Sequence, residues 1–237
     1  MNKLSIIIPI FNEETTISEI LKRVYVVKLP AGISKEIIVI DDGSTDSSKL
    51  KVKNSKFKGL KKIFHQKNSG KGAAIRTGIR YATGDFVLIQ DADLEYDPFF
   101  YKLLVEPILT RNARVVYGSR LINYPLKLWG KNRTVLPTHL MANKFLTLLT
   151  NLLYGSKLTD METGYKLFKK EVLKNIVLKS ERFDFEAEVT AKILKRKIPI
   201  TEVSISVKPR TYNEGKKIGW MDGIAAIWTL IKYKFVD

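Results

Sequence analysis

The chain has 237 residues, of which 45% are hydrophobic and 27% charged, and its formal net charge is +17 at pH 7. A chain of this composition folds, and its length gives room for one sizeable α/β domain. It has no cysteine and only two histidines, which excludes disulfides, thiolate catalysis and metal sites rich in cysteine or histidine. A metal would have to be bound by oxygen.

The large positive charge predicts attraction to an anionic partner, which can be nucleic acid, an acidic membrane surface or a phosphorylated substrate. The N-terminus is not typical of a signal peptide, because its apolar run at 4–8 is short and Pro9 follows it directly. No stretch approaches the roughly 18 to 20 apolar residues of a membrane-spanning helix. We therefore expect the protein to stay on the side of the membrane where it is made.

The first hundred residues alternate between short apolar strands and amphipathic helices. The pattern predicts strands at 4–10, 36–40, 60–64 and 85–90, with helices at 15–27, 47–54 and 70–83 between them. Such alternation favours a mostly parallel sheet with helices on both faces. Ligands of these sheets bind beyond the carboxyl ends of the strands, and the polar motifs of this chain follow the strand ends.

The pattern is looser after residue 98. A short strand is predicted at 114–117, a helix at 185–196, a strand at 200–207 and an amphipathic helix at 219–235. From 108 to 159 there is no acidic residue but there are eight lysines and arginines, and this segment contains a very apolar helix at 139–154. That helix fits either an ordinary core or a membrane interface, where the tryptophans and lysines of the last helix would also be favourable. No repeat or long linker divides the chain, so we expect a single domain over 1–237.

Paired carboxylates follow the strand at 85–90. Asp91 and Asp93 could share a divalent ion with a diphosphate, although a solvated turn is the simpler interpretation of an isolated Asp-x-Asp. Asp42 follows the strand at 36–40. It fits either an Asp-Gly turn or an acceptor for the imino hydrogen of a nucleobase.

Gly70-Lys71-Gly72 opens a predicted helix and could form a tight loop beneath a nucleotide. The spacing is not that of a P-loop, which excludes a P-loop nucleotide hydrolase. A dinucleotide-dependent oxidoreductase is also disfavoured, because the first strand is followed by Pro-Ile-Phe-Asn-Glu and not by a Gly-x-Gly-x-x-Gly turn.

Taken in order, the motifs SIIIPIFNE (5–13), IDDGSTD (40–46), GKGAAIR (70–76), ATGD (82–85) and QDADL (90–94) resemble those of the family 2 glycosyltransferases. The resemblance continues through GSR (118–120), TD (159–160) with TG (163–164), the segment 185–188 and RTYNEGK (210–216). It is closest to the branch with dolichyl-phosphate mannosyltransferase, dolichyl-phosphate glucosyltransferase and their bacterial polyprenyl-phosphate relatives. The resemblance implies the GT-A nucleotide-sugar-binding fold.

The resemblance also implies roles for individual residues. The nucleoside pocket would be lined by Pro9, Phe11, Glu13, Ile40 and Asp42. Ribose, diphosphate and a Mg²⁺ or Mn²⁺ ion would be held by Asp91, Ala92 and Asp93, with Glu95 as a further metal ligand where relatives often have Gln. The donor phosphates would be contacted by Arg120, Arg210 and Lys216, and the acceptor phosphate by Arg133. Glu188 matches an acidic position of the family and fits a structural role equally well.

The expected reaction is transfer of a hexose from GDP-mannose or UDP-glucose to a polyprenyl or dolichyl phosphate, with inversion. A phosphate monoester is largely dianionic at neutral pH, so it needs no general base. An essential base at Asp184, Glu186 or Glu188 would instead indicate transfer to a sugar hydroxyl of a polysaccharide or glycolipid. A nucleic-acid-binding protein would explain the charge, but acids at the strand ends would repel a phosphate backbone, so we expect no nucleic-acid partner.

The two parts of the chain are expected to divide the work. Residues 1–98 would bind the nucleotide sugar, and residues 99–237 would bind the acceptor and carry the interface helices. The protein would be peripheral on the cytoplasmic face of a membrane, where each basic residue near an anionic leaflet contributes on the order of 1 kcal/mol. It would work alone or with a membrane-protein partner.

Overall fold

The computed structural model describes residues 2–122, 137–210 and 219–236. These residues form one seven-stranded sheet in the order β3-β2-β1-β4-β6-β5-β7. The strands are β1 Asn2–Ile10, β2 Ile33–Asp41, β3 Leu60–Phe64, β4 Phe86–Ile89, β5 Val115–Ser119, β6 Lys166–Lys169 and β7 Ile200–Ser204. The helices are α1 Ile17–Val26, α2 Ser48–Asn54, α3 Lys71–Tyr81, η1 Pro98–Phe100, α4 Tyr101–Thr110, α5 Pro137–Tyr154, α6 Lys170–Lys174, α7 Phe185–Lys195 and α8 Trp220–Phe235.

The sheet is mostly parallel, as the alternating pattern predicts. Strands β1 to β4 pair with one another in parallel, and β5 pairs in parallel with β7. Strand β6 lies between β4 and β5 and runs antiparallel to both. The sheet is therefore continuous from the first half of the chain into the second.

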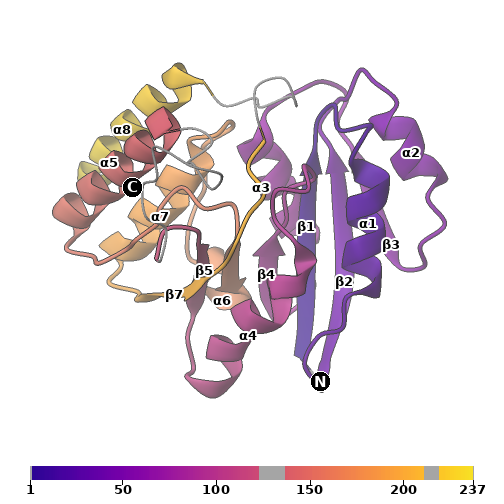
Figure 1. Cartoon of the computed structure of the whole chain (residues 1–237), viewed down its shortest axis with the longest axis horizontal. Helices are drawn as coiled ribbons and strands as arrows, with labels where there is room; N and C mark the ends of the chain where they lie inside the picture. Colours follow the sequence, from indigo (N-terminus) through magenta and orange to yellow (C-terminus); the bar gives the residue numbers. More distant parts are fainter. Residues whose placement is uncertain (1, 123–136, 211–218, 237) are drawn as a thin grey trace, which may run out of the picture.

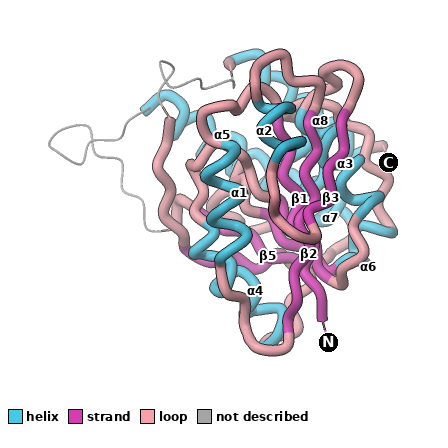
Figure 2. The backbone as a smooth tube through the Cα atoms, turned by 90° about the vertical axis from the view of Figure 1, so that its right-hand side faces the viewer, coloured by secondary structure: helices cyan, strands magenta, loops and turns pink. Residues whose placement is uncertain are grey.

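Helices cover both faces of the sheet, because alternate residues of the buried strands point to opposite sides. The even-numbered apolar residues of β1 pack against α1 and α4. Ile7 and the apolar residues Ile38 and Ile40 of β2 pack against α3 and α7 on the other face. Figure 2 shows the two helical layers on either side of the strands.

Helices α5 and α8 form an outer layer that packs mainly on α7, and Ile200 of the edge strand β7 also packs against the shared cluster. Ala187 and Ala191 of α7 contact a cluster with Leu146 of α5 and with Ala226 and Leu230 of α8. The small alanines allow the three helices to approach closely, and α5 and α8 lie side by side in Figure 1. No helix within the described ranges is long and apolar enough to cross a membrane.

The predicted elements at 114–117, 139–154, 185–196, 200–207 and 219–235 are present as β5, α5, α7, β7 and α8, whereas the sequence pattern misses α4, β6 and α6. Helix α4 contains Pro107, which lacks a backbone N–H and obscures the helical signal. Strand β6 has only four residues, two of them lysines that suggest a solvent-exposed segment. Lys166 is nevertheless fully buried, because its Nζ donates to two backbone carbonyls and lies 4.0 Å from the ring centre of Tyr117.

Candidate active site

A pocket of about 960 Å³ opens at the carboxyl ends of the central strands and extends to the outer helices α5 and α8. Its polar end is formed by the residues that follow β1 and β4 and by the start of α3. Its other end is lined by residues of α5 and α8. The predicted site residues that line it are Pro9, Phe11, Glu13, Asp42, Asp91, Ala92, Asp93, Glu95, Arg120 and Arg210.

The loop that follows β4 is fixed by the buried Gln90. The amide of Gln90 donates to the backbone carbonyls of Asp91 (2.9 Å) and Tyr96 (3.1 Å), and its Oε1 accepts from the hydroxyls of Tyr101 and Tyr165. A fully satisfied buried amide holds its neighbours in one arrangement. Gln90 therefore sets the direction in which the carboxylates of this loop enter the pocket.

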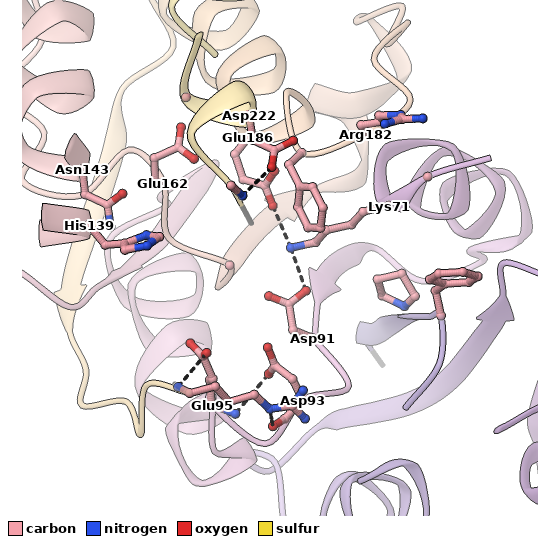
Figure 3. A pocket seen from close by; sticks show the side chains of 18 of the residues that line it. Lys71, Asp91, Asp93, Glu95, His139, Asn143, Glu162, Arg182, Glu186 and Asp222 are labelled. Carbon is pink, nitrogen blue, oxygen red and sulfur yellow. Dashed lines mark hydrogen bonds and ion pairs between the residues drawn. The ribbon is translucent and has the colours of Figure 1, made fainter. Parts of the chain in front are cut away.

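Asp91 belongs to a chain of three alternating charges (Figure 3). Lys71 Nζ lies 2.8 Å from Asp91 Oδ1 and 2.8 Å from Glu186 Oε1. Burial disfavours the ammonium, but the two carboxylates outweigh this effect and hold the pKa of Lys71 well above its usual value. Lys71 thus stays charged and places Asp91 and Glu186 on the same wall of the pocket.

The glycines on either side of Lys71 allow a close approach of two backbones. A Cβ on Gly70 would lie 2.3 Å from the carbonyl oxygen of Glu181, and one on Gly72 would lie 2.5 Å from that of Ser180. Gly70 also has a φ of +98°, which disfavours other residues. The Gly-Lys-Gly motif therefore docks the start of α3 against the loop before α7 and brings Lys71 to Glu186.

Asp93 lies deeper in the same loop, where like charges surround it. Burial, together with the nearby carboxylates of Asp91 and Glu95, raises the pKa of Asp93 to about 7. Asp93 Oδ1 accepts from the backbone N–H of Glu95 (3.0 Å), while Glu95 Oε1 accepts from the backbone N–H of Arg210 (3.0 Å). A cation at this place would relieve the repulsion between the carboxylates.

The described residues fit a metal held jointly by the protein and its substrate. No three of their histidine, aspartate and glutamate side chains are grouped closely enough to hold a metal by themselves. Magnesium is commonly bound by one or two carboxylates and by substrate phosphates. Asp91 and Asp93 can supply these two carboxylates. Glu95, the third predicted ligand, accepts a hydrogen bond from the backbone N–H of Arg210.

Arg210 was expected to contact donor phosphates, and here it ties two parts of the pocket together. Its guanidinium donates to both carboxylate oxygens of Glu13 (2.8 and 3.2 Å) and to the backbone carbonyl of Asp93 (2.8 Å). Arg210 thereby joins the segment after β7 to the ends of β1 and β4. A donor phosphate that reaches Arg210 would compete with Glu13.

Asp42 and Ile40 were both expected to line the nucleoside pocket, and their surroundings in the structure differ from that expectation. Asp42 is 2% exposed, and its carboxylate contacts His65 Nδ1 (2.6 Å) and accepts from the backbone N–H groups of Ser69 and Gly70. It lines the pocket, but in this arrangement it anchors the loop before α3. Ile40 is not among the lining residues; its side chain is fully buried in the core between the sheet and α3.

Arg120 lines the pocket in a bidentate pair with Asp160. Its Nε and Nη2 lie 2.7 and 2.8 Å from the two carboxylate oxygens, and its backbone N–H also donates to Asp160. Burial opposes its charge, yet Asp160 keeps the pKa of Arg120 well above its usual value. Two other predicted residues, Arg133 and Lys216, lie outside the described residues.

Residues 5–177 match the model of glycosyl transferase family 2. The chain belongs to glycosyltransferase family 2. It is 29% identical over 248 residues to a UDP-N-acetylglucosamine–dolichyl-phosphate N-acetylglucosaminyltransferase of Methanococcus voltae, covering 97% of this chain and 95% of the relative. It is also 29% identical over 192 residues to dodecaprenyl-phosphate galacturonate synthase of Rhizobium johnstonii, covering 77% of this chain and 52% of the relative.

The fold agrees with that of a solved glycosyltransferase. Glucosyl-3-phosphoglycerate synthase of Mycobacterium tuberculosis, crystallised with Mn²⁺, UDP and phosphoglyceric acid, superposes with a TM-score of 0.73 and 21% identity. The superposition covers 100% of this chain and 80% of the other. The family and the GT-A fold predicted from the motifs are confirmed, and this chain is a glycosyltransferase.

Several pocket residues of this glycosyltransferase carry no role in the motif-based assignment, among them Lys71, Glu162 and Glu186. The Gly-Lys-Gly motif signals Lys71, although its glycines suggest a phosphate loop more readily than an ion pair. Glu186 was considered only as a base. Glu162 comes shortly after the acid-free segment 108–159, and nothing in its sequence neighbours predicts that it lines the pocket.

The three acids of the segment after residue 183, which are Asp184, Glu186 and Glu188, have different surroundings. Glu188 is fully buried and accepts from the backbone N–H groups of Lys179 and Ser180 and from Lys192 Nζ, which is a structural arrangement. Asp184 accepts from the backbone N–H of Arg182. Only Glu186 of these three acids lines the pocket of the glycosyltransferase.

Proposed function

We propose that this glycosyltransferase moves a hexose from a nucleotide sugar, GDP-mannose or UDP-glucose, to a polyprenyl or dolichyl phosphate with inversion. The observation that carries the proposal is the shape of one pocket, which joins the carboxylates after β4 to the apolar walls of α5 and α8. A charged donor and a lipid phosphate can therefore meet in it. Relatives over most of the chain are named for transfer to dolichyl and dodecaprenyl phosphates, which supports this acceptor.

The residues divide between donor and acceptor. Residues 1–98 supply most of the polar end, including Asp91 and Asp93, while residues 99–237 supply α5 and α8. A Mg²⁺ or Mn²⁺ ion held by Asp91, Asp93 and the diphosphate would neutralise the charge that grows on the leaving nucleoside diphosphate. The dianionic acceptor needs no base. It needs cations that align it with the anomeric carbon, a role that the resemblance gives to Arg133, while Arg120 at the pocket wall would contact the donor phosphates.

Purified protein should transfer a radiolabelled hexose to a short prenyl phosphate when Mg²⁺ or Mn²⁺ is present. A screen with GDP-mannose, UDP-glucose and UDP-N-acetylglucosamine, read by the mass of the lipid product, identifies the donor. The label should move into organic solvent. If it stays in the aqueous phase with every donor and appears only on an added oligosaccharide, the acceptor is a sugar hydroxyl and the proposal is wrong.

We further propose that α5 and α8 bind the surface of the membrane, on its cytoplasmic face. Large apolar side chains on these helices are exposed, among them Phe145 (55%), Leu152 (75%), Trp220 (76%), Trp228 (65%) and Phe235 (80%). Interfacial helices combine such side chains with tryptophan and lysine. The net charge of +17 favours the anionic cytoplasmic leaflet. A membrane-protein partner would add to this attachment.

Replacing Phe145 and Trp228 together by glutamine should lower the partition of the protein onto anionic liposomes at least about ten-fold, since each large apolar side chain contributes roughly 1.5–3 kcal/mol when buried. Flotation with vesicles of phosphatidylcholine and phosphatidylserine measures this. The matched control is Leu50→Gln on α2, which is 59% exposed and lies across the molecule from α5 and α8 in Figure 1. Equal losses in both proteins would contradict the assignment.

A further inference from the structure

Two residues that line the pocket each have a buried carboxylate oxygen without a hydrogen-bond donor among the described residues. The two atoms are Oε2 of Glu186, a residue that is 5% exposed, and Oε1 of Glu162. Figure 3 shows both residues on the side of Asp91 that is opposite Asp93 and Glu95. A buried acceptor without a donor is costly, so a ligand that donates hydrogen bonds would be stabilised at this place.

Specific contacts hold both glutamates, or the backbone that carries them, in the pocket wall. Glu186 lies in the first turn of α7, and its other oxygen is held by Lys71 Nζ at 2.8 Å. Glu162 lies in a turn fixed by Lys166, whose Nζ donates to the backbone carbonyls of the residues on either side of Glu162 (2.7 and 2.8 Å). The Glu186 carboxylate is therefore oriented, and the backbone that carries Glu162 is fixed, before a ligand binds, which lowers the cost of binding.

The two groups are close enough to interact electrostatically. Burial and then the charge of Glu186 raise the pKa of Glu162 to about 7. The nearby cations are already engaged: Lys71 pairs with Asp91 and Glu186, Arg120 pairs with Asp160, and Lys166 donates to backbone carbonyls. This part of the pocket is thus rich in hydrogen-bond acceptors and poor in free positive charge.

We propose that Glu162 and Glu186 form a sugar subsite that accepts hydrogen bonds from the hydroxyl or N–H groups of an uncharged hexose. The inference rests on the proposed function, because a diphosphate at Asp91 and Asp93 would direct its sugar toward these two residues. Carboxylate acceptors form strong, charge-assisted hydrogen bonds with hydroxyl groups. A uronic acid would bring another negative charge beside two carboxylates and is rejected. The subsite therefore determines specificity for the sugar and not for the nucleotide.

The test compares the binding of a nucleoside diphosphate with that of its sugar conjugate by calorimetry, in wild type and in Glu162→Gln and Glu186→Gln. Each variant should bind UDP or GDP within about two-fold of wild type. Binding of the cognate nucleotide hexose should weaken roughly ten-fold or more, as for a lost hydrogen bond to a charged group. The preference of wild type for UDP-glucose over UDP-glucuronate should fall in both variants.

Deoxy analogues of the donor link each carboxylate to one hydroxyl. Removing the contacted hydroxyl should weaken binding to wild type, and the matching variant should show no additional loss. The control Glu181→Gln removes the same charge from an exposed side chain outside the pocket and should change neither affinity. Equal weakening of nucleotide and nucleotide sugar, or a wild type that prefers the glucuronate, overturns the subsite. If wild type binds no nucleotide at all, the proposed function itself fails.

Discussion

Asp93→Asn should abolish sugar transfer and at the same time make the metal-free protein more stable. The loss of activity should be at least about 10³-fold, because the variant lacks a carboxylate that would hold the metal at the leaving diphosphate. The gain in stability follows from the surroundings of Asp93, where burial and the charges of Asp91 and Glu95 disfavour its ionised form. Asparagine keeps the shape of the protonated acid without the charge.

The gain should depend on pH in a defined direction. The pKa of Asp93 is raised from 3.8 to about 7 in the folded protein. Wild type therefore loses stability as the pH rises from about 4 to about 7, where the unfolded chain releases a proton that the folded chain retains. The variant does not, so its melting temperature should equal that of wild type near pH 4 and exceed it by on the order of 10 °C at pH 8, because about three pKa units correspond to roughly 4 kcal/mol.

Thermal unfolding followed by circular dichroism, with chelator present, measures this difference. Adding Mn²⁺ with UDP should raise the melting temperature of wild type and leave that of the variant nearly unchanged. A variant that retains a tenth of the activity, or that is less stable than wild type at pH 8, would contradict both the role of Asp93 and the repulsion described here.

Gly164→Ala should lower kcat about 100-fold or more, although residue 164 itself bears no chemistry. A Cβ there would lie 2.3 Å from Asp91 Oδ2 and 3.0 Å from the ring of Tyr96. The Asp91 carboxylate must then move, and a displacement of about 1 Å at a reacting centre costs on the order of 10² in rate. Overpacking should also reduce stability by about 1–3 kcal/mol.

The control for lost stability is Gly32→Ala, in the loop before β2. Gly32 has a φ of +82°, which strains alanine, but its Cβ would meet no atom within 4 Å and it lies far from the pocket lining. This variant should be destabilised and remain active. Steady-state kinetics of both variants, at a temperature where each is folded, separate the displacement of Asp91 from a loss of stability. A kcat within three-fold of wild type for Gly164→Ala would show that Asp91 has room to adjust.

The first half of the fold could be predicted from sequence because most of β1, β2 and β4 is buried and polar turns flank the strands. Strands β1 to β4 and the helices between them lie close to their predicted ranges. The pattern failed at β6, where Lys166 reads as a surface residue although carbonyl oxygens and an aromatic ring satisfy its charge. Periodicity carries no information about such compensation, so the antiparallel strand in the middle of the sheet was missed.

The candidate site also has residues that the sequence pattern predicts and residues that depend on tertiary packing. Asp91 and Asp93 were found because they directly follow an apolar strand, and the structure brings both to one pocket. The contacts of Glu162 and Glu186 with this pocket depend on how β6 and α7 pack beside β4, which no local pattern reports. Their roles, like those of the other site residues, remain predictions for the experiments above.

Because α5 and α8 rest mainly on α7, their outward side chains contribute little to the packing around the sheet. Substitutions on that side can accumulate without disturbing the carboxylates at the other end of the pocket. Descendants of one ancestral enzyme could thus adapt to lipids of different length or to different bilayers while they keep the same donor chemistry.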